Sequence, residues 1–231
     1  MLRPWILALA VALSLAVGVG CRTRPAQVAT IPFGQGDQAV YDLLHDGTKI
    51  GTVIVETAQD ETTGDWTLSY CDSFGRRATV VARDRTLEPI GSTTEWLENG
   101  VRLRSEASYG NGQVSISTDG PDGTRTAVIA LLPHTYDNEQ LLITARAFPL
   151  ARGFRGRFGL VLTSAAITGQ GSLRVVGEET VSAMGDQIPC YVVEFRLAGG
   201  RQRAWYQMAA PHHLVKYANG STGLTLARVG Q

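Results

Sequence analysis

Apolar and polar residues alternate along most of the chain beyond residue 39. In residues 101–109, one face carries Val101, Leu103, Ser105 and Ala107, and the other carries Arg102, Arg104, Glu106 and Ser108. A period of two residues is typical of a strand in a sheet with one buried and one solvated face. The alternation therefore predicts a mainly antiparallel β domain.

Turn signals divide this region into short segments. Asp46-Gly47 and Asn99-Gly100 favour tight hairpins, because these residues readily adopt positive φ angles. The predicted strands span residues 40–45, 49–57, 65–74, 76–85, 92–98, 101–109, 114–118, 126–132, 158–168, 172–183, 188–197, 203–208, 214–218 and 222–229. About a dozen strands at such even spacing predict an all-β fold, either a single curled antiparallel sheet or an open β-barrel.

One short helix is expected within the β domain. Asp137 can cap its first turn, with Gln140 as the partner in a capping box, and Pro149 ends it. An apolar stripe at helical spacing consists of Leu141, Leu142, Ala145 and Phe148. We expect this stripe to pack on the sheet.

The first residues have the parts of a secretory signal. Arg3 begins the segment, Ile6–Val17 is apolar, and Gly18-Val19-Gly20-Cys21 is similar to a bacterial lipobox, with Gly18 where leucine is usual. The resemblance implies a lipid on Cys21. We predict a lipoprotein-type signal peptide over 1–20, an acylated N-terminus and flexible tether over 21–38, and a single β domain over 39–231.

Two alternatives to lipidation stay open: an ordinary cleavage site beside an incidental Cys21 thiol, and an uncleaved membrane anchor. The lipobox reading implies a protein of the cell envelope, attached to a membrane through Cys21. Arg22 follows the cysteine where an aspartate would favour retention at the inner membrane. This favours the outer membrane, with the domain facing the periplasm.

Charge and cysteine content narrow the partners. The 21 basic and 21 acidic residues balance, so nucleic acid is not an expected partner. Beyond Cys21, the chain has Cys71 and Cys190, each within a predicted strand. An even number of thiols in an oxidising compartment permits a disulfide between them, and two buried free thiols are the alternative.

Motifs for catalysis and metal binding are weak. The neighbours His212 and His213 point to opposite faces if they lie in a strand, and no zinc-like spacing accompanies them. Glu178 and Glu179 are separated in the same way, and Gly169–Ser172 lacks the G-x-S-x-G form. We therefore expect no catalytic residues, no metal and no cofactor, and do not expect an enzyme.

Arginines in neighbouring predicted strands have acidic residues nearby. The basic set is Arg76, Arg77, Arg83, Arg85, Arg102 and Arg104, and the acidic set is Asp84, Glu95, Glu98 and Glu106. We expect the two sets to pair across the sheet. A patch that binds lipid phosphate or an acidic partner is the alternative.

Aromatic residues are the candidates for a binding face. In a curled sheet some of them line the concave side, and we assign this role to Trp96, Phe148, Phe158 and Trp205, with core packing as the alternative. The expected function is non-catalytic binding of an apolar or lipid-like ligand in a half-open barrel. The alternative is a structural or interaction module that contacts another envelope protein and binds no small ligand.

Three groups of short motifs carry a family resemblance. They are Tyr41–Thr52, then Thr135–Asn138 with Ala145–Leu150, and finally Gly177–Glu179 with Trp205-Tyr206 and Leu214–Tyr217. Together they resemble a bacterial envelope family known as a domain of unknown function, the 3108-like family. The architecture is distantly similar to half-barrel periplasmic carriers and receptors of lipoproteins. That similarity implies a concave apolar sheet that holds acyl chains beneath helical elements.

Overall fold

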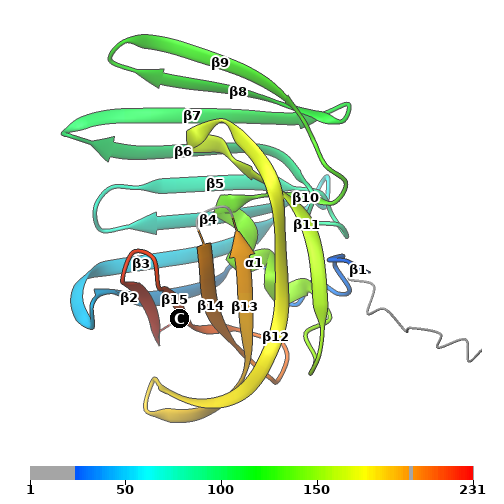
Figure 1. The fold of residues 1–231 in the computed structure, drawn as a ribbon, viewed down its shortest axis with the longest axis vertical. Helices are drawn as coiled ribbons and strands as arrows, with labels where there is room; N and C mark the ends of the chain where they lie inside the picture. The colour runs from blue at the N-terminus through cyan, green and yellow to red at the C-terminus, as the bar shows by residue number, and fades with distance from the viewer. Residues whose placement is uncertain (1–23, 198–199, 231) are drawn as a thin grey trace, which may run out of the picture.

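Strands pair into one continuous 16-stranded sheet in the computed structural model, which describes residues 24–197 and 200–230 (Figure 1). The strands are β1 (Arg24–Pro25), β2 (Asp37–His45), β3 (Thr48–Gln59), β4 (Trp66–Asp72), β5 (Arg77–Ala82), β6 (Pro89–Glu98), β7 (Val101–Gly110), β8 (Gln113–Gly120), β9 (Gly123–Ala130), β10 (Thr135–Asp137), β11 (Arg155–Leu162), β12 (Ile167–Ala183), β13 (Asp186–Leu197), β14 (Gly200–Gln207), β15 (Leu214–Asn219) and β16 (Leu224–Gly230). Their order is β1-β11-β12-β13-β14-β15-β16-β2-β3-β4-β5-β6-β7-β8-β9, with β10 also on β11.

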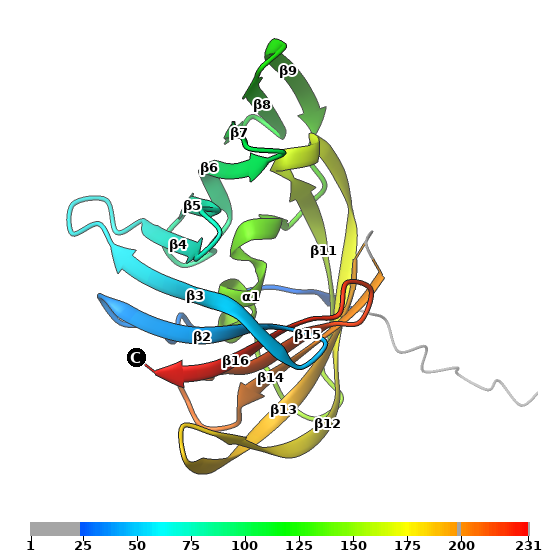
Figure 2. The ribbon, with the colours of Figure 1, turned by 90° about the vertical axis from the view of Figure 1, so that its left-hand side faces the viewer.

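The sheet is curled but open. Most neighbours are hairpin partners in antiparallel register, and β16 joins β2 to unite the two halves of the chain. Among the described strands, only β1 and β10 pair in parallel, both on β11. No pairing among the described strands connects β9 to β11, so the sheet forms a half-barrel (Figure 2). The all-β prediction of a curled sheet or open barrel is confirmed.

The strand prediction was wrong at residues 158–168, where it placed one strand. The chain instead leaves β11 at Leu162 and makes a 3₁₀ turn, η3 (Thr163–Ala165). Ala166 then takes a left-handed conformation with φ of 50° before β12 begins. This reversal lets β12 pair antiparallel with β11, and alternation alone does not reveal it because both strands share the apolar period.

The helical segment lies inside the curve of the sheet. It comprises η1 (Asn138–Gln140), α1 (Leu141–Thr144) and η2 (Ala145–Ala147). The Asp137 carboxylate accepts the Glu139 backbone N–H over 2.9 Å, which confirms the predicted cap. The Gln140 side chain donates to the Leu87 carbonyl over 2.7 Å and to Thr144 over 2.9 Å. The capping box is therefore replaced by a tie to the loop between β5 and β6.

The main core fills the space between the concave face and the helical segment. Its large buried side chains include Tyr136, Leu141, Phe148, Phe158, Phe195 and Tyr206. A smaller cluster of Ile188, Cys190, Val192, Trp205 and Val215 packs on the opposite face of β13, β14 and β15. At β13, β14 and β15 the sheet thus buries apolar residues on both of its faces.

Residues 24–38 are packed against the domain, so the prediction of a tether was wrong for this described part. The Ala26 backbone N–H donates to Arg157 over 2.7 Å, and that of Ala29 donates to Ala147 over 2.8 Å. The Phe33 ring meets Trp66 edge-on at 4.9 Å between centroids. The segment has no periodic pattern of apolar residues, so these contacts with distant parts of the chain hold it in place. The signal segment and Cys21 lie outside the described residues.

The disulfide prediction is not met in the structure, because Cys71 and Cys190 are both free. Cys71 is on β4 and Cys190 is on β13, with β14, β15, β16, β2 and β3 between them in the sheet. Cys190 is buried against Trp205 and its neighbours, as expected for a small apolar side chain. The free-thiol alternative describes these residues.

The expected arginine pairs form in part on the solvated face. Glu95 accepts from Arg102 at 3.4 Å and from Arg104 at 3.3 Å, and Arg85 lies 3.6 Å from Asp84. Arg76 is the exception, because it pairs with Glu139 of the helical segment at 2.6 Å.

Among the described residues, no helix has the length and apolar character to cross a membrane.

Candidate functional site: a cavity on the concave face

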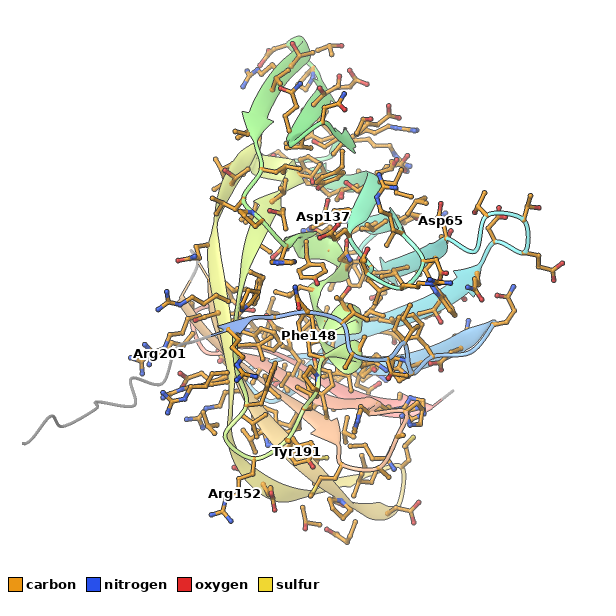
Figure 3. All side chains as sticks on the ribbon, turned by 90° about the vertical axis from the view of Figure 1, so that its right-hand side faces the viewer. Asp65, Asp137, Phe148, Arg152, Tyr191 and Arg201 are labelled. Atoms are coloured by element: carbon orange, nitrogen blue, oxygen red, sulfur yellow. The ribbon has the colours of Figure 1, made fainter. Side chains whose placement is uncertain are left out.

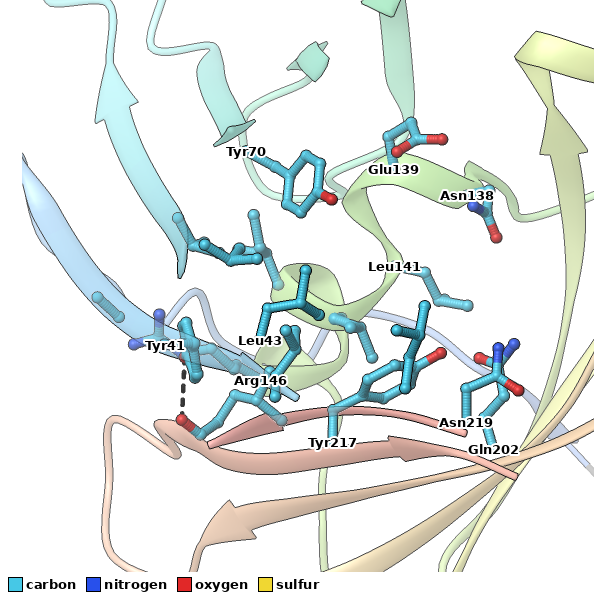
Figure 4. A pocket seen from close by; sticks show the side chains of 18 of the residues that line it. Tyr41, Leu43, Tyr70, Asn138, Glu139, Leu141, Arg146, Gln202, Tyr217 and Asn219 are labelled. Atoms are coloured by element: carbon cyan, nitrogen blue, oxygen red, sulfur yellow. Dashed lines mark hydrogen bonds between the residues drawn. The ribbon is translucent and has the colours of Figure 1, made fainter. Parts of the chain in front are cut away.

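A cavity of about 290 Å³ lies between the helical segment and the concave face of β2, β3, β15 and β16. Alternate residues of β3 and β16 line it, as the period of a strand requires. Its apolar walls include Leu43, Val53, Val55, Leu141, Leu214 and Leu226. Figure 4 shows this space with its polar residues toward the ends.

Arg146 occupies one end of the cavity. Its guanidinium Nη2 lies 2.8 Å from the Asp37 carboxylate and 3.3 Å from His213 Nδ1, and its Nε donates to the Pro211 carbonyl over 3.3 Å. The guanidinium carbon Cζ also lies over the Phe33 ring, 5.3 Å from the ring centroid. Both members of the ion pair are largely buried, which fixes the guanidinium in one position.

The surroundings of Arg146 are rich in positive charge. Arg228 is only 3% exposed, follows Leu226 along the concave side of β16, and its Nε has no hydrogen-bond partner among the described residues. Burial, reinforced by Arg228 and Arg146, lowers the pKa of His213 to about 4. Burial raises the pKa of Tyr41 to about 12. At neutral pH the histidine and the phenol are therefore uncharged.

A second ion pair lies above the middle of the cavity. Arg76 contacts the Glu139 carboxylate at 2.6 Å, and the Tyr70 hydroxyl donates to Asp72 over 3.0 Å. Burial raises the pKa of Glu139, although Arg76 opposes the shift. The pair joins β4 and β5 to the helical segment and so holds the roof of the cavity over the sheet.

Neutral polar groups line the far end. Asn138, Gln202 and Asn219 lie there, across the cavity from Arg146 (Figure 4). Tyr217 forms part of the floor, and burial raises the pKa of its hydroxyl to about 12. The cavity thus has an apolar middle, a charged end and an amide-rich end.

A buried aspartate next to this site links β7 to the turn η3. Asp137 Oδ2 accepts from the Tyr109 hydroxyl over 2.6 Å and from the Thr163 hydroxyl over 2.7 Å. The same carboxylate caps η1 through its other oxygen. Figure 3 shows Asp137 and Phe148 toward opposite ends of the helical segment, inside the curved sheet. This contact positions the segment that forms the roof.

The four predicted ligand-face aromatics do not line this cavity, so that prediction was wrong for the site. Phe148 and Phe158 are core residues, each with its ring edge-on to Tyr136. Trp205 is on the opposite face of the sheet, where its indole N–H donates to Glu179 over 2.7 Å. Trp96 is in a separate hollow beside the β8–β9 turn. Core packing, the alternative reading, describes Phe148 and Phe158.

Sequence reasoning missed the polar residues of this site, above all Arg146, which lines the cavity, and Arg228, which lies close to it. Arg146 stands between two buried alanines of the helical segment, and this charged residue within an apolar stretch was a usable signal. Arg228 lies on the concave side of β16 but has no local mark of burial. Tyr41 and Tyr217 look like ordinary strand aromatics.

The remaining candidates have structural surroundings. His212 lies in the turn after Pro211, and its ring Nδ1 is 2.9 Å from the Gln207 carbonyl oxygen. His134 contacts Gln27 and lies 3.8 Å from Glu88. Within the described part of the chain, no group of three or more His, Cys, Asp or Glu side chains is arranged to hold a metal ion.

Comparisons with known proteins identify a family but no activity. The model of the family described as "Protein of unknown function (DUF3108)" matches residues 35–218. A solved structure described as a beta-barrel-like protein of domain of unknown function DUF1849 from Brucella abortus shares 14% identity, with a TM-score of 0.49 over 90% of this chain and 97% of that chain. No curated protein matches the chain.

Proposed function

The chain belongs to the DUF3108 family of proteins of unknown function, and we propose that it binds a small apolar or lipid-like ligand, without catalysis, in the cavity on the concave face. The observation that carries the proposal is a cavity of about 290 Å³ whose middle is formed by aliphatic side chains and whose ends are polar. Small-molecule sites in proteins combine an apolar lining with a few placed polar groups in the same way.

The size of the cavity limits the ligand. Typical small-molecule pockets enclose about 300–1,000 Å³, so this one stands at the lower bound. It suits a single short alkyl chain or a compact apolar molecule, and it is too small for a lipid with several acyl chains. The proposed ligand is therefore smaller than an intact lipoprotein anchor.

The polar groups support binding rather than catalysis. Burial keeps Tyr41 and Tyr217 protonated, and burial together with nearby arginines keeps His213 neutral. The main carboxylates, Asp37 and Glu139, are held in ion pairs with arginines. Such groups are suited to orienting a ligand through hydrogen bonds and fixed charges.

The experiment is binding of N-phenyl-1-naphthylamine, a neutral apolar dye whose fluorescence rises in a dry site. Val55 lines the cavity, whereas its neighbour Glu56 points to the opposite face of β3. We expect the wild-type protein and Glu56→Trp to bind the dye, and Val55→Trp to lose it because the indole fills the space. Mass spectrometry of organic extracts then identifies any lipid that co-purifies.

An interaction module is the second candidate, and the free edge of the sheet favours it. Within the described part of the chain, β9 pairs only with β8, and the Val128 side chain of β9 is exposed. An unpaired edge is a template for a strand from another protein. If the folded wild-type protein does not bind the dye and its organic extracts contain no lipid, the interaction module is favoured over ligand binding.

We also propose that the domain acts in the bacterial cell envelope, attached to the outer membrane by a lipid on Cys21 and facing the periplasm. The support is the apolar run ending in Gly18-Val19-Gly20-Cys21, which belongs to the residues outside the structural description. Radiolabelled palmitate should enter the wild-type protein in growing bacteria and not Cys21→Ser. Equal labelling of the two would exclude acylation at this residue.

A further inference from the structure

Two buried arginines next to the cavity share one carboxylate. Arg146 and Arg228 are 7% and 3% exposed, and the Asp37 carboxylate lies 2.8 Å from Arg146. The Arg228 Nε is buried and has no hydrogen-bond partner among the described residues. With His213 and Tyr41 uncharged, the cluster retains one uncompensated positive charge.

An uncompensated buried charge is costly for a folded protein unless something offsets it. Arg228 follows Leu224 and Leu226 on the concave side of β16, and both leucines line the cavity. Its strand partner is Tyr41, which also lines the cavity. The charge of Arg228 also interacts with Arg146 and Asp37, so its guanidinium lies close to the end of the cavity that Arg146 occupies.

We propose that the cluster of Arg146 and Arg228 binds the anionic head group of a single-chain amphiphile whose alkyl chain occupies the apolar cavity. This inference rests on the proposed function and specifies its ligand class. A singly charged carboxylate matches the surplus charge of the cluster. Guanidinium groups recognise carboxylate and phosphate through parallel N–H donors, so both head groups share the required chemistry.

Opposite the cluster, Gln202 and Asn219 close the cavity with uncharged amides. A chain that enters with its head at the arginines would pass Leu226 and Leu43 before its end reaches these amides. The small volume favours a short alkyl chain. The arrangement discriminates against cationic amphiphiles, because a positive head would face two arginines at close range.

The experiment measures displacement of N-phenyl-1-naphthylamine by decanoate, decyl phosphate, decanol and decyltrimethylammonium at pH 8. We expect decanoate or decyl phosphate to displace the dye at about tenfold lower concentration than decanol, the equivalent of one charge-assisted hydrogen bond. The cationic compound should be weakest. The order of the two anions identifies the head group as carboxylate or phosphate.

The variants Arg228→Met and Arg228→Lys test the residue itself. With displacement scaled to each variant's own affinity for the dye, Arg228→Met should lose the preference for anions, while Arg228→Lys should keep part of it because the charge is retained. Arg203→Met, at an exposed position on β14, is the matched control and should behave as wild type. The urea midpoint of Arg228→Met should be unchanged or higher, since an unpaired buried charge has been removed.

Several outcomes would overturn the inference. Displacement of the dye by decanoate and decanol at equal concentrations would show that the site does not recognise an anionic head group. A preference for anions that persists in Arg228→Met would show that Arg228 does not bind the head group. Acetate that stabilises the protein as much as decanoate would indicate a site for a free anion instead. Failure of the wild-type protein to bind the dye at all would refute the apolar site, and with it the proposed function.

Discussion

The Tyr109 hydroxyl donates to a carboxylate oxygen of Asp137 over 2.6 Å, and this bond joins β7 to the start of the helical segment. Backbone pairing does not link these elements. Because both residues are buried, the bond holds the open side of the half-barrel against the segment that roofs the cavity. The helical segment that roofs the cavity is therefore bonded to β7, which belongs to the half of the sheet that does not line the cavity.

Replacement of Tyr109 by phenylalanine should lower the free energy of unfolding by about 2 kcal/mol, because a buried carboxylate loses a donor. Urea denaturation at pH 7 measures the change. Tyr191→Phe is the control, since Tyr191 is only partly buried at the side of the core, and its effect should stay within about 0.5 kcal/mol. Equal losses in the two variants would show that the bond contributes nothing specific.

Asp37→Asn should destabilise the protein by about 3 kcal/mol, since it leaves Arg146 buried without a countercharge. Asp42→Asn removes a carboxylate from an ion pair with Lys49, which is largely exposed, and should cost less than about 1 kcal/mol. Both aspartates lie on β2, so the comparison isolates burial. The prediction fails if the two urea midpoints shift by the same amount.

Gly171→Ala should destabilise the fold by about 1–3 kcal/mol, because a Cβ atom there would lie 2.4 Å from the buried ring of Phe158. Gly169 is on the same strand, and a Cβ atom there would meet no atom within 4 Å. Gly169→Ala should therefore be neutral or slightly stabilising. Thermal unfolding of both variants separates close packing from the general effect of losing a glycine.

His213 should make the protein less stable as the pH falls from 7 to 5. Its pKa is lowered to about 4 in the folded state by burial and by Arg228 and Arg146, whereas an unfolded histidine titrates near 6.5. Between these values the unfolded state binds more protons, so stability rises with pH. After a discount for partial exposure, the loss at pH 5 is about 1 kcal/mol.

The measurement for His213 is urea denaturation of the wild type and His213→Gln at both pH values. The glutamine variant should lose about 1 kcal/mol less than the wild type between pH 7 and pH 5. Asp37, Arg146 and Arg228 are unchanged in both proteins, so they cancel in the comparison. Parallel pH profiles would show that His213 is protonated to the same extent in the folded and unfolded states.

Cys190 should react with iodoacetamide far more slowly than Cys71 in the native protein. Burial raises the pKa of the Cys190 thiol to about 11, and its side chain is covered, while Cys71 is partly accessible. Peptide mapping after labelling at pH 8 measures each residue separately. Both should label fully in urea without a reductant. Labelling that requires dithiothreitol would reveal a disulfide instead.

Local features of the sequence determined most of the secondary structure. Asp46-Gly47 and Asn99-Gly100 lie at the predicted hairpin turns with positive φ angles, because the requirement for such angles is local. The Asp137 cap was readable for the same reason. The turn at Thr163–Ala165 was missed because the apolar period runs through it without interruption.

Only the tertiary structure decided which residues form the cavity. Alternation shows that Tyr41 and Leu43 share one face of a strand, but it does not show which face is concave or which aromatics the core absorbs. The pairing of β16 with β2 brings Arg228 beside Tyr41 across most of the chain length. Such proximity arises from the curvature and closure of the sheet, which depend on long-range packing and leave no mark in local sequence.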